Sequence, residues 1–282
     1  MTIAIALKVG DGVVLGADSA STMMAPGGIA NVYFNAEKIF NLVKGLPIGV
    51  VIAGLGGLSG RSITSLSRDL RERIRGRADP DFILDPTTYT IENAAIMLRR
   101  FFFEEHYRNE YGAATAGTQL PSMSLLVAGY SAGAPMSEVW SVEIDQAGNC
   151  AAPTLHIPQH VSGQAQWRGQ PEALNRLVNG WSTGVHQRLV AAGMSPDDAL
   201  AILNSAPNVP LLAAGMPLQD AIDLVHFLID VTAGFVRFAP GAPTVAPPTD
   251  SAAITKHEGF RWVRRKHYFD SELNRPIDRH VL

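Results

Sequence analysis

The chain has 282 residues, a length that suits one large domain or two small ones. Hydrophobic residues make up 46% and charged residues 17% of it, which is a globular rather than a disordered composition. The net charge of −3 excludes a general attraction to nucleic acid or to anionic membranes.

The cysteine count and the hydropathy pattern exclude further classes of protein. Cys150 is the only cysteine, which excludes a disulfide framework and a cysteine-based metal site within one chain. The apolar run at residues 3–7 is too short for a signal peptide and Lys8 follows it, while no run reaches the ~20 residues of a membrane span. We expect a soluble cytoplasmic protein without cofactor or metal.

The first 54 residues predict two pairs of strands joined by turns and one loop. Residues 3–7 and 13–17 are almost continuously apolar, and Asp11-Gly12 supplies a tight turn between them. Strands of this kind are usually covered on both faces. Residues 24–37 contain proline and glycine and predict a loop. Residues 38–43 and 46–54 predict a second buried strand pair.

Helices and strands then follow in blocks. Apolar periodicity predicts helices at 59–75, at 91–111 with Thr90 as N-cap, at 173–192, at 196–203 and at 217–235. Strands are predicted at 123–128, 139–144, near Thr154, at 251–255 and at 260–264. Alternating βα units are absent, which excludes a doubly wound parallel sheet. This order predicts an α/β (α+β) fold of two sheets face to face with helices outside, as one domain at 1–265 with a polar tail at 266–282.

Four further stretches contain residue types that are found at catalytic or binding sites. Gly129–Gly133 reads "GYSAG", the nucleophile elbow of α/β-hydrolases, but strand periodicity follows where that motif needs a helix. The glycines of residues 53–60 match no phosphate loop, although they permit close approach of a ligand. The arginine-rich residues 68–77 predict a solvated helix face, and "HIPQH" at 156–160 contains a proline that argues against a metal-binding helix.

The N-terminus offers a more specific arrangement. Removal of Met1 would leave Thr2 with a hydroxyl and a free α-amine, which titrates near ~7.7–8.0 and is a base at neutral pH. A threonine hydroxyl activated by its own amine is a known nucleophile. Such a site needs a nearby positive charge and a backbone N–H for the oxyanion. Lys38, Asp18 to orient it, and Gly54 at a strand end are the candidates.

These residues carry a resemblance to a known family. The pattern "TIAIALK…GVVLGADS…EKIF…VIAG" resembles the N-terminal third of proteasome β-subunits and their bacterial relatives, the N-terminal-nucleophile hydrolases, near the ancestral-β-subunit group. The resemblance implies a four-layer αββα sandwich. It implies Thr2 as nucleophile, Asp18 and Lys38 as its charged partners, and Gly54 as the oxyanion glycine.

The resemblance also extends to binding and supporting positions. It places Thr22 where the family binds substrate backbone and Ile52 on a wall of the primary specificity pocket. It places Gln164 where proteasome subunits have a supporting serine, with Gly163 before it as a second supporting residue. The family's usual D-x-x-S-G-G motif near the C-terminus is missing.

The function predicted from these residues is a threonine peptidase that cleaves peptide or unfolded protein through an acyl-ester. The resemblance implies a homo-oligomeric ring or helical assembly, with an ATPase partner left open. The alternatives are a non-catalytic ring or scaffold subunit, a small-molecule amidase on the same fold, and a serine esterase at Ser131.

Overall fold

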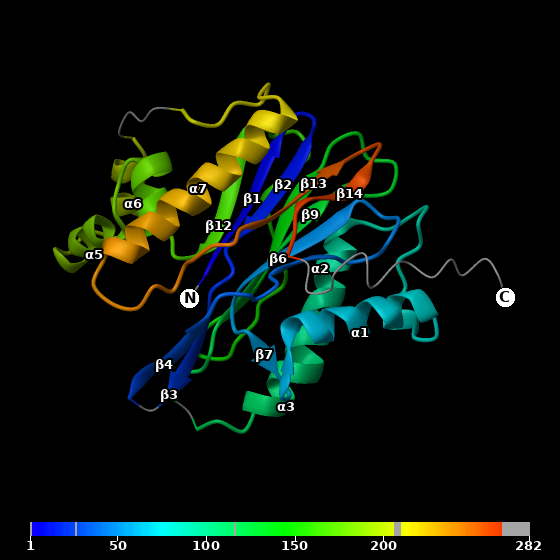
Figure 1. The fold of residues 1–282 in the computed structure, drawn as a ribbon, viewed down its shortest axis with the longest axis horizontal. Helices are drawn as coiled ribbons and strands as arrows, with labels where there is room; N and C mark the ends of the chain where they lie inside the picture. Colours follow the sequence, from blue (N-terminus) through cyan, green and yellow to red (C-terminus); the bar gives the residue numbers. More distant parts are fainter. Residues whose placement is uncertain (1, 26, 116, 206–209, 267–282) are drawn as a thin grey trace.

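The computed structural model describes residues 2–25, 27–115, 117–205 and 210–266. Two five-stranded antiparallel sheets lie face to face in the centre of the molecule (Figure 1). In sheet order, the first contains β12 (Gln164–Gly169), β1 (Ile3–Val9), β2 (Gly12–Ala17), β13 (Asp250–Thr255) and β14 (Gly259–Arg264). The second contains β11 (Thr154–Ile157), β10 (Glu138–Ile144), β9 (Met123–Gly129), β6 (Ile48–Gly54) and β5 (Ile39–Asn41).

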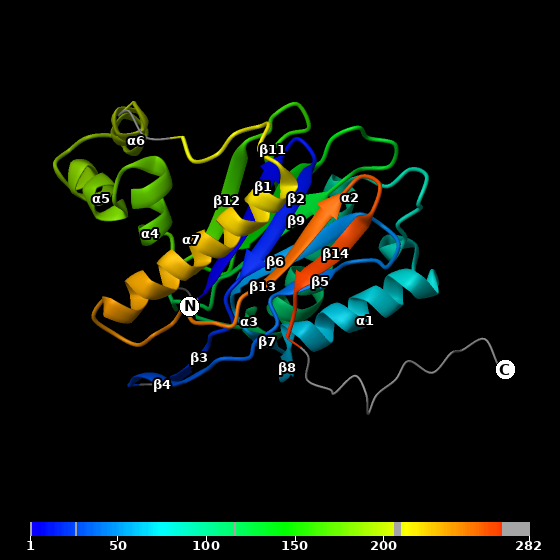
Figure 2. The same ribbon diagram turned by 45° about the horizontal axis from the view of Figure 1, so that its top comes forward.

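Helices cover the outer face of each sheet (Figure 2). Over the first sheet lie α7 (Leu218–Phe238) and the short α4 (Glu172–Leu174), which continues into a π-helical segment (Asn175–Asn179). Over the second lie α1 (Ile63–Gly76) and α2 (Ile91–Arg99), which runs through a π-helical segment (Arg100–Tyr107) into α3 (Arg108–Tyr111). The remaining helices are a 3₁₀ turn (Pro80–Phe82) and the pair α5 (Thr183–Ala191) and α6 (Pro196–Asn204), which contact each other.

The alternation of side chains along β1 explains its continuous apolar sequence. Ala4 and Ala6 face the second sheet, whereas Ile3, Ile5 and Leu7 pack beneath α7. Successive side chains of a strand point to opposite faces, so a strand covered on both faces is apolar at every position. The structure therefore confirms the predicted four-layer αββα sandwich.

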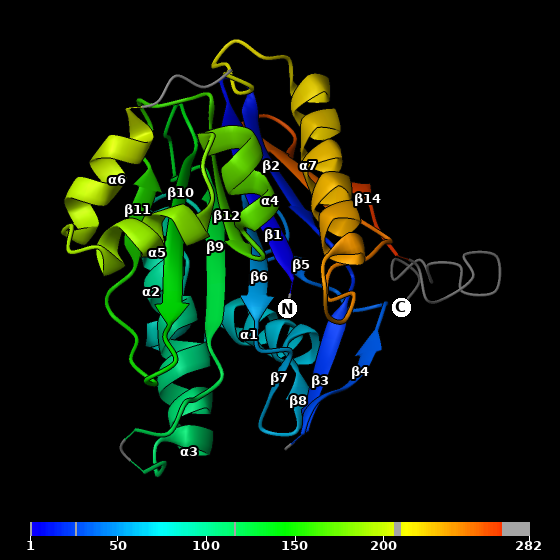
Figure 3. The same ribbon diagram turned by 90° about the vertical axis from the view of Figure 1, so that its left-hand side faces the viewer.

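Two small hairpins project from one end of the sandwich, β3 (Ser21–Ala25) with β4 (Gly28–Tyr33), and β7 (Gly57–Leu58) with β8 (Arg61–Ser62) (Figure 3). The prediction of a loop over 24–37 is wrong, because much of that segment forms β4. Met23 and Met24 are exposed on β3, so this hairpin lacks the buried face that reveals most strands in a sequence.

Two further predictions differ from the structure. Strand β12 is absent from the predicted elements because the edge strand "QAQWRG" is mostly polar and buries only Ala165. The single helix expected over 173–192 is interrupted at Gly180, and α5 starts anew with Ser182 as its N-cap. Thr90 caps α2 as predicted, since its Oγ1 accepts the N–H of Asn93 at 3.0 Å.

No helix in the described part of the chain is both long and apolar enough to cross a membrane. The domain boundary after residue 265 stays a prediction, and 267–282 of the expected tail, like Met1, lie outside the described residues.

Candidate active site

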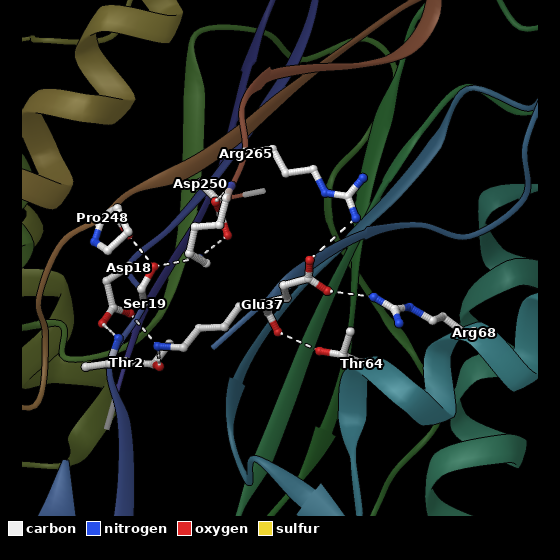
Figure 4. Close-up of polar contacts among 12 residues, drawn as sticks. Thr2, Asp18, Ser19, Glu37, Thr64, Arg68, Pro248, Asp250 and Arg265 are labelled. Carbon is white, nitrogen blue, oxygen red and sulfur yellow. Dashed lines mark hydrogen bonds and ion pairs between the residues drawn. The ribbon is translucent and has the colours of Figure 1, made fainter. Parts of the chain in front are cut away.

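Three side chains meet at the N-terminal end of β1 (Figure 4). The Nζ atom of Lys38 donates one hydrogen bond to Oγ1 of Thr2 and another, at 2.6 Å, to Oδ1 of Asp18. All three residues are buried, with Asp18 fully so. The arrangement places an amine directly beside a hydroxyl and a carboxylate directly behind the amine.

Asp18 is held by backbone N–H groups from three parts of the chain. Its Oδ1 accepts from Ile3 at 3.0 Å, and its Oδ2 accepts from Ala20 at 2.8 Å and from Ala246 at 3.2 Å. Charge-assisted bonds of this kind stabilise an ionised carboxylate and fix its orientation. Asp18 is therefore a rigid partner for Lys38.

Burial determines the ionisation of Lys38. It lowers the pKa of the Lys38 amine below its ordinary range, and the charge and hydrogen bond of Asp18 oppose that effect without cancelling it. A lowered pKa increases the fraction of uncharged amine at neutral pH, and only that form accepts a proton.

Lys38 directly precedes β5. A backbone hydrogen bond joins it to Ile52 on β6, the residue predicted to line the specificity pocket. The N–H of Ile52 donates to the carbonyl oxygen of Lys38 at 3.0 Å. Two residues further on, Gly54 ends β6 with φ +95°, and a Cβ there would lie 2.3 Å from the carbonyl oxygen of Ser122. Only glycine fits this bend, which turns the chain beside the site.

An open groove of about 1060 Å³ passes over these residues. Its lining includes every residue that the sequence assigned to catalysis or substrate binding except the fully buried Asp18: Thr2, Thr22, Lys38, Ile52 and Gly54. One wall is the β3–β4 hairpin, and the glycine-rich segment before and within the β7–β8 hairpin forms another. The structure thus brings residues from four segments of the sequence to one surface.

Gly163 and Gln164 are not part of this arrangement. In the register of β1 with β12, Gln164 pairs with Lys8, five residues along the strand from Ile3. At the rise of a β-strand this puts it about 17 Å from the N-terminal end. Their predicted position beside the nucleophile is wrong, because they lie at the start of β12 and it is the other end of that strand that pairs beside Thr2. The polar sequence of β12 does not reveal this strand.

Gly169 and Gln170 occupy that position instead, although neither was predicted from the sequence. The N–H of Gln170 donates to the carbonyl oxygen of Thr2 at 2.7 Å. A Cβ on Gly169 would lie 1.9 Å from the same oxygen, and its φ of +102° also favours glycine. The signal available in the sequence was a glycine two residues before a proline at the entry to a helix, in "RGQPEAL".

The rival sites have structural explanations. Ser131 lies in the β9–β10 hairpin, where its Oγ donates to Glu138 at 2.5 Å and accepts the N–H of Ile91 at 3.0 Å. The nucleophile elbow is therefore excluded, because a strand rather than a helix follows. His156 is hydrogen-bonded to Ser141 and Arg168, and no cluster of three potential metal ligands exists among the described residues.

The basic stretch on α1 is also largely paired. Arg68 contacts Glu37 at 3.2 Å, and Arg73 contacts both Asp79 and Glu105. Arg68 and Arg75 are more than half exposed, which agrees with the solvated helix face predicted from the sequence.

Comparisons with known proteins agree with the class of fold that the layers define. No protein-family model matches the sequence, and no curated protein matches it. Among solved structures, the Gly-1 mutant of Anbu from Hyphomicrobium sp. strain MC1 is similar, with a TM-score of 0.51 over 94% of this chain and 86% of that chain. The two sequences are 14% identical over the match. This chain therefore shares the fold of Anbu.

Proposed function

We propose that this chain is an N-terminal threonine peptidase. The observation that carries the proposal is the contact of Lys38 Nζ with both Thr2 Oγ1 and Asp18, at the wall of an open groove. A nucleophilic hydroxyl needs a base within hydrogen-bonding distance and a group that orients the base, and these three residues supply that order of contacts.

The proposed reaction uses this order of contacts. After removal of Met1, Oγ1 of Thr2 attacks the peptide carbonyl carbon while its proton moves to the adjacent amine of Lys38. The backbone N–H of Gly54 stabilises the oxyanion. The carbon–nitrogen bond then breaks, the leaving amine takes up a proton, and an ester joins Thr2 to the acyl half. Water hydrolyses that ester and restores the hydroxyl.

Lys38 takes the role of immediate proton acceptor because it contacts the hydroxyl. The role expected from the sequence was different, with the α-amine of Thr2 as the base and Lys38 lowering its pKa. In the present proposal the α-amine acts next, in passing the proton to the leaving group.

The open shape of the groove supports a peptide rather than a small-molecule amide. Pockets for small ligands range from about 300 to 1,000 Å³ and enclose most of the ligand. This groove, at about 1060 Å³, is at the upper end of that range in volume, but it is open and is lined by both hairpins rather than enclosed.

We also propose that the chain self-associates. The β3–β4 hairpin exposes Met23, Met24, Ile29 and Tyr33 together, and the adjoining Phe34 is exposed as well. Several large exposed apolar side chains on one hairpin are a feature of interaction sites, although four of these residues also line the groove. Light scattering of the purified chain tests this: oligomers are expected, and a strict monomer at micromolar concentration refutes self-association.

The test of the peptidase proposal compares Thr2→Ala with Ser131→Ala in hydrolysis of a fluorogenic peptide library. Loss of turnover in Thr2→Ala and wild-type turnover in Ser131→Ala support the proposal. Turnover that survives Thr2→Ala refutes it.

A further inference from the structure

A second buried lysine–aspartate pair lies behind the Thr2–Lys38–Asp18 arrangement. After β14, Lys266 forms an ion pair with Asp250, and its backbone N–H donates to Oδ1 of the same carboxylate at 3.1 Å. The side chains are 7% and 2% exposed. Transfer of two charged groups out of water costs free energy, which must be offset by their ion pair and by further hydrogen bonds. The hydrogen-bond partners of this pair therefore show which part of the structure it holds.

Ser19 connects this pair to the site (Figure 4). Lys266 Nζ donates to Ser19 Oγ at 2.5 Å, and Ser19 Oγ in turn donates to the carbonyl oxygen of Pro248. The N–H of Ser19 donates to the carbonyl oxygen of Ala246 at 3.0 Å. Ala246 is also one of the residues whose N–H holds Asp18. The segment 246–250 and Lys266 therefore pack against Asp18 and Ser19 through these hydrogen bonds.

We propose that Lys266 and Asp250 are positioning residues that hold Ser19 and the segment 246–250 against Asp18, and through Asp18 keep Lys38 in place beside Thr2. This inference deepens the proposed threonine-peptidase function and rests on it for its catalytic consequence. Neither residue contacts Thr2, so each acts through the groups between.

The charges that face Lys38 support this role. Burial lowers the pKa of Lys38 most; Asp18 raises it, Lys266 lowers it, and Asp250 raises it. The carboxylate of Glu37, next in the chain, is directed instead to Arg68 and Arg265. The two members of the second pair therefore act on Lys38 with opposite signs, so removing them singly has opposite consequences.

The primary experiment measures the pKa of Lys38 directly. The chain has five lysines, Lys8, Lys38, Lys44, Lys256 and Lys266, so the side-chain signals of lysine-labelled protein are assignable by substitution in an NMR titration. We expect Lys266→Met to raise the pKa of Lys38 and Asp250→Asn to lower it. The double variant, which leaves no unpaired buried charge, returns it towards the wild-type value.

Two substitutions control for structural effects. Lys266→Arg keeps the positive charge and should leave the pKa of Lys38 near its wild-type value. Lys256 lies exposed in the turn between β13 and β14, at the opposite end of β13 from Asp250, so Lys256→Met should change nothing. A merely structural contribution would lower stability in both single variants without opposite shifts of the pKa.

The catalytic consequence is measured as the rate of acylation by a β-lactone against pH. If uncharged Lys38 accepts the proton, the rate rises with pH through its pKa, and the midpoint follows the two variants in opposite directions. Equal pKa values of Lys38 in wild type, Lys266→Met and Asp250→Asn, or shifts of one sign, overturn the inference. Opposite pKa shifts without acylation of Thr2 refute the peptidase function while leaving the charge coupling intact.

Discussion

Substitution of Gly169 by alanine tests how the candidate nucleophile is held in place. The new Cβ would lie 1.9 Å from the carbonyl oxygen of Thr2 and 2.7 Å from its carbonyl carbon. These are backbone atoms of the residue that directly precedes β1, so the backbone at Thr2 must move by about 1 Å to restore an ordinary contact distance. A displacement of that size at a reacting group costs about 100-fold in rate. We expect Gly169→Ala to reduce β-lactone acylation of Thr2 by about 100-fold or more.

Backbone strain must be separated from this displacement. Because φ at Gly169 is +102°, an alanine at this position carries about 1–2 kcal/mol of backbone strain in addition to the clash. Gly193 is a matched control, because it has φ +99° and a Cβ added there would meet no atom within 4 Å. Gly193→Ala should therefore lose similar stability and keep its acylation rate. The assay is intact-mass kinetics with thermal melting alongside. Equal rates in the two variants would refute the reasoning.

Two further predictions concern buried charges. Asp18→Asn removes the charge that raises the pKa of Lys38, so the midpoint of the acylation rate against pH should shift to lower pH. The same variant loses one partner of a buried ion pair, so its free energy of unfolding in urea should fall by about 3–5 kcal/mol. Unchanged stability would contradict this. Lys8 is fully buried, and burial lowers its pKa to about 8. The unfolded chain then binds more protons above that pH, so stability should rise from about pH 8 towards the ordinary Lys value of 10.5, and Lys8→Met should lose this rise.

The N-terminal site was predictable from sequence because its parts lie at strand ends within the first 54 residues. Thr2, Asp18, Lys38 and Gly54 each border an apolar strand with a clear pattern, and antiparallel pairing of those strands brings their ends together. The layers were predictable for a related reason. Strands that are apolar at every position need cover on both faces, and the helices came in two blocks.

The C-terminal contributions were not predictable, since they depend on pairings across long stretches of chain. Strand β12 is polar at an edge, so nothing in its periodicity revealed that Gly169 would pair opposite Ile3. Asp250 and Lys266 look like ordinary charges near the end of a strand pair. Their burial follows only from the antiparallel pairing of β13 with β2, which sets Asp250 opposite Ala17.

The proposed peptidase requires Thr2 to be an N-terminal nucleophile with a free amine beside its hydroxyl. A peptide epoxyketone is a specific probe for this residue, because it forms a ring with the amine and hydroxyl of one N-terminal threonine. Intact mass with peptide mapping should show one adduct per chain, on a peptide that begins at Thr2 and lacks Met1. Active protein that retains Met1, or an adduct on any other residue, would show that Thr2 is not the nucleophile.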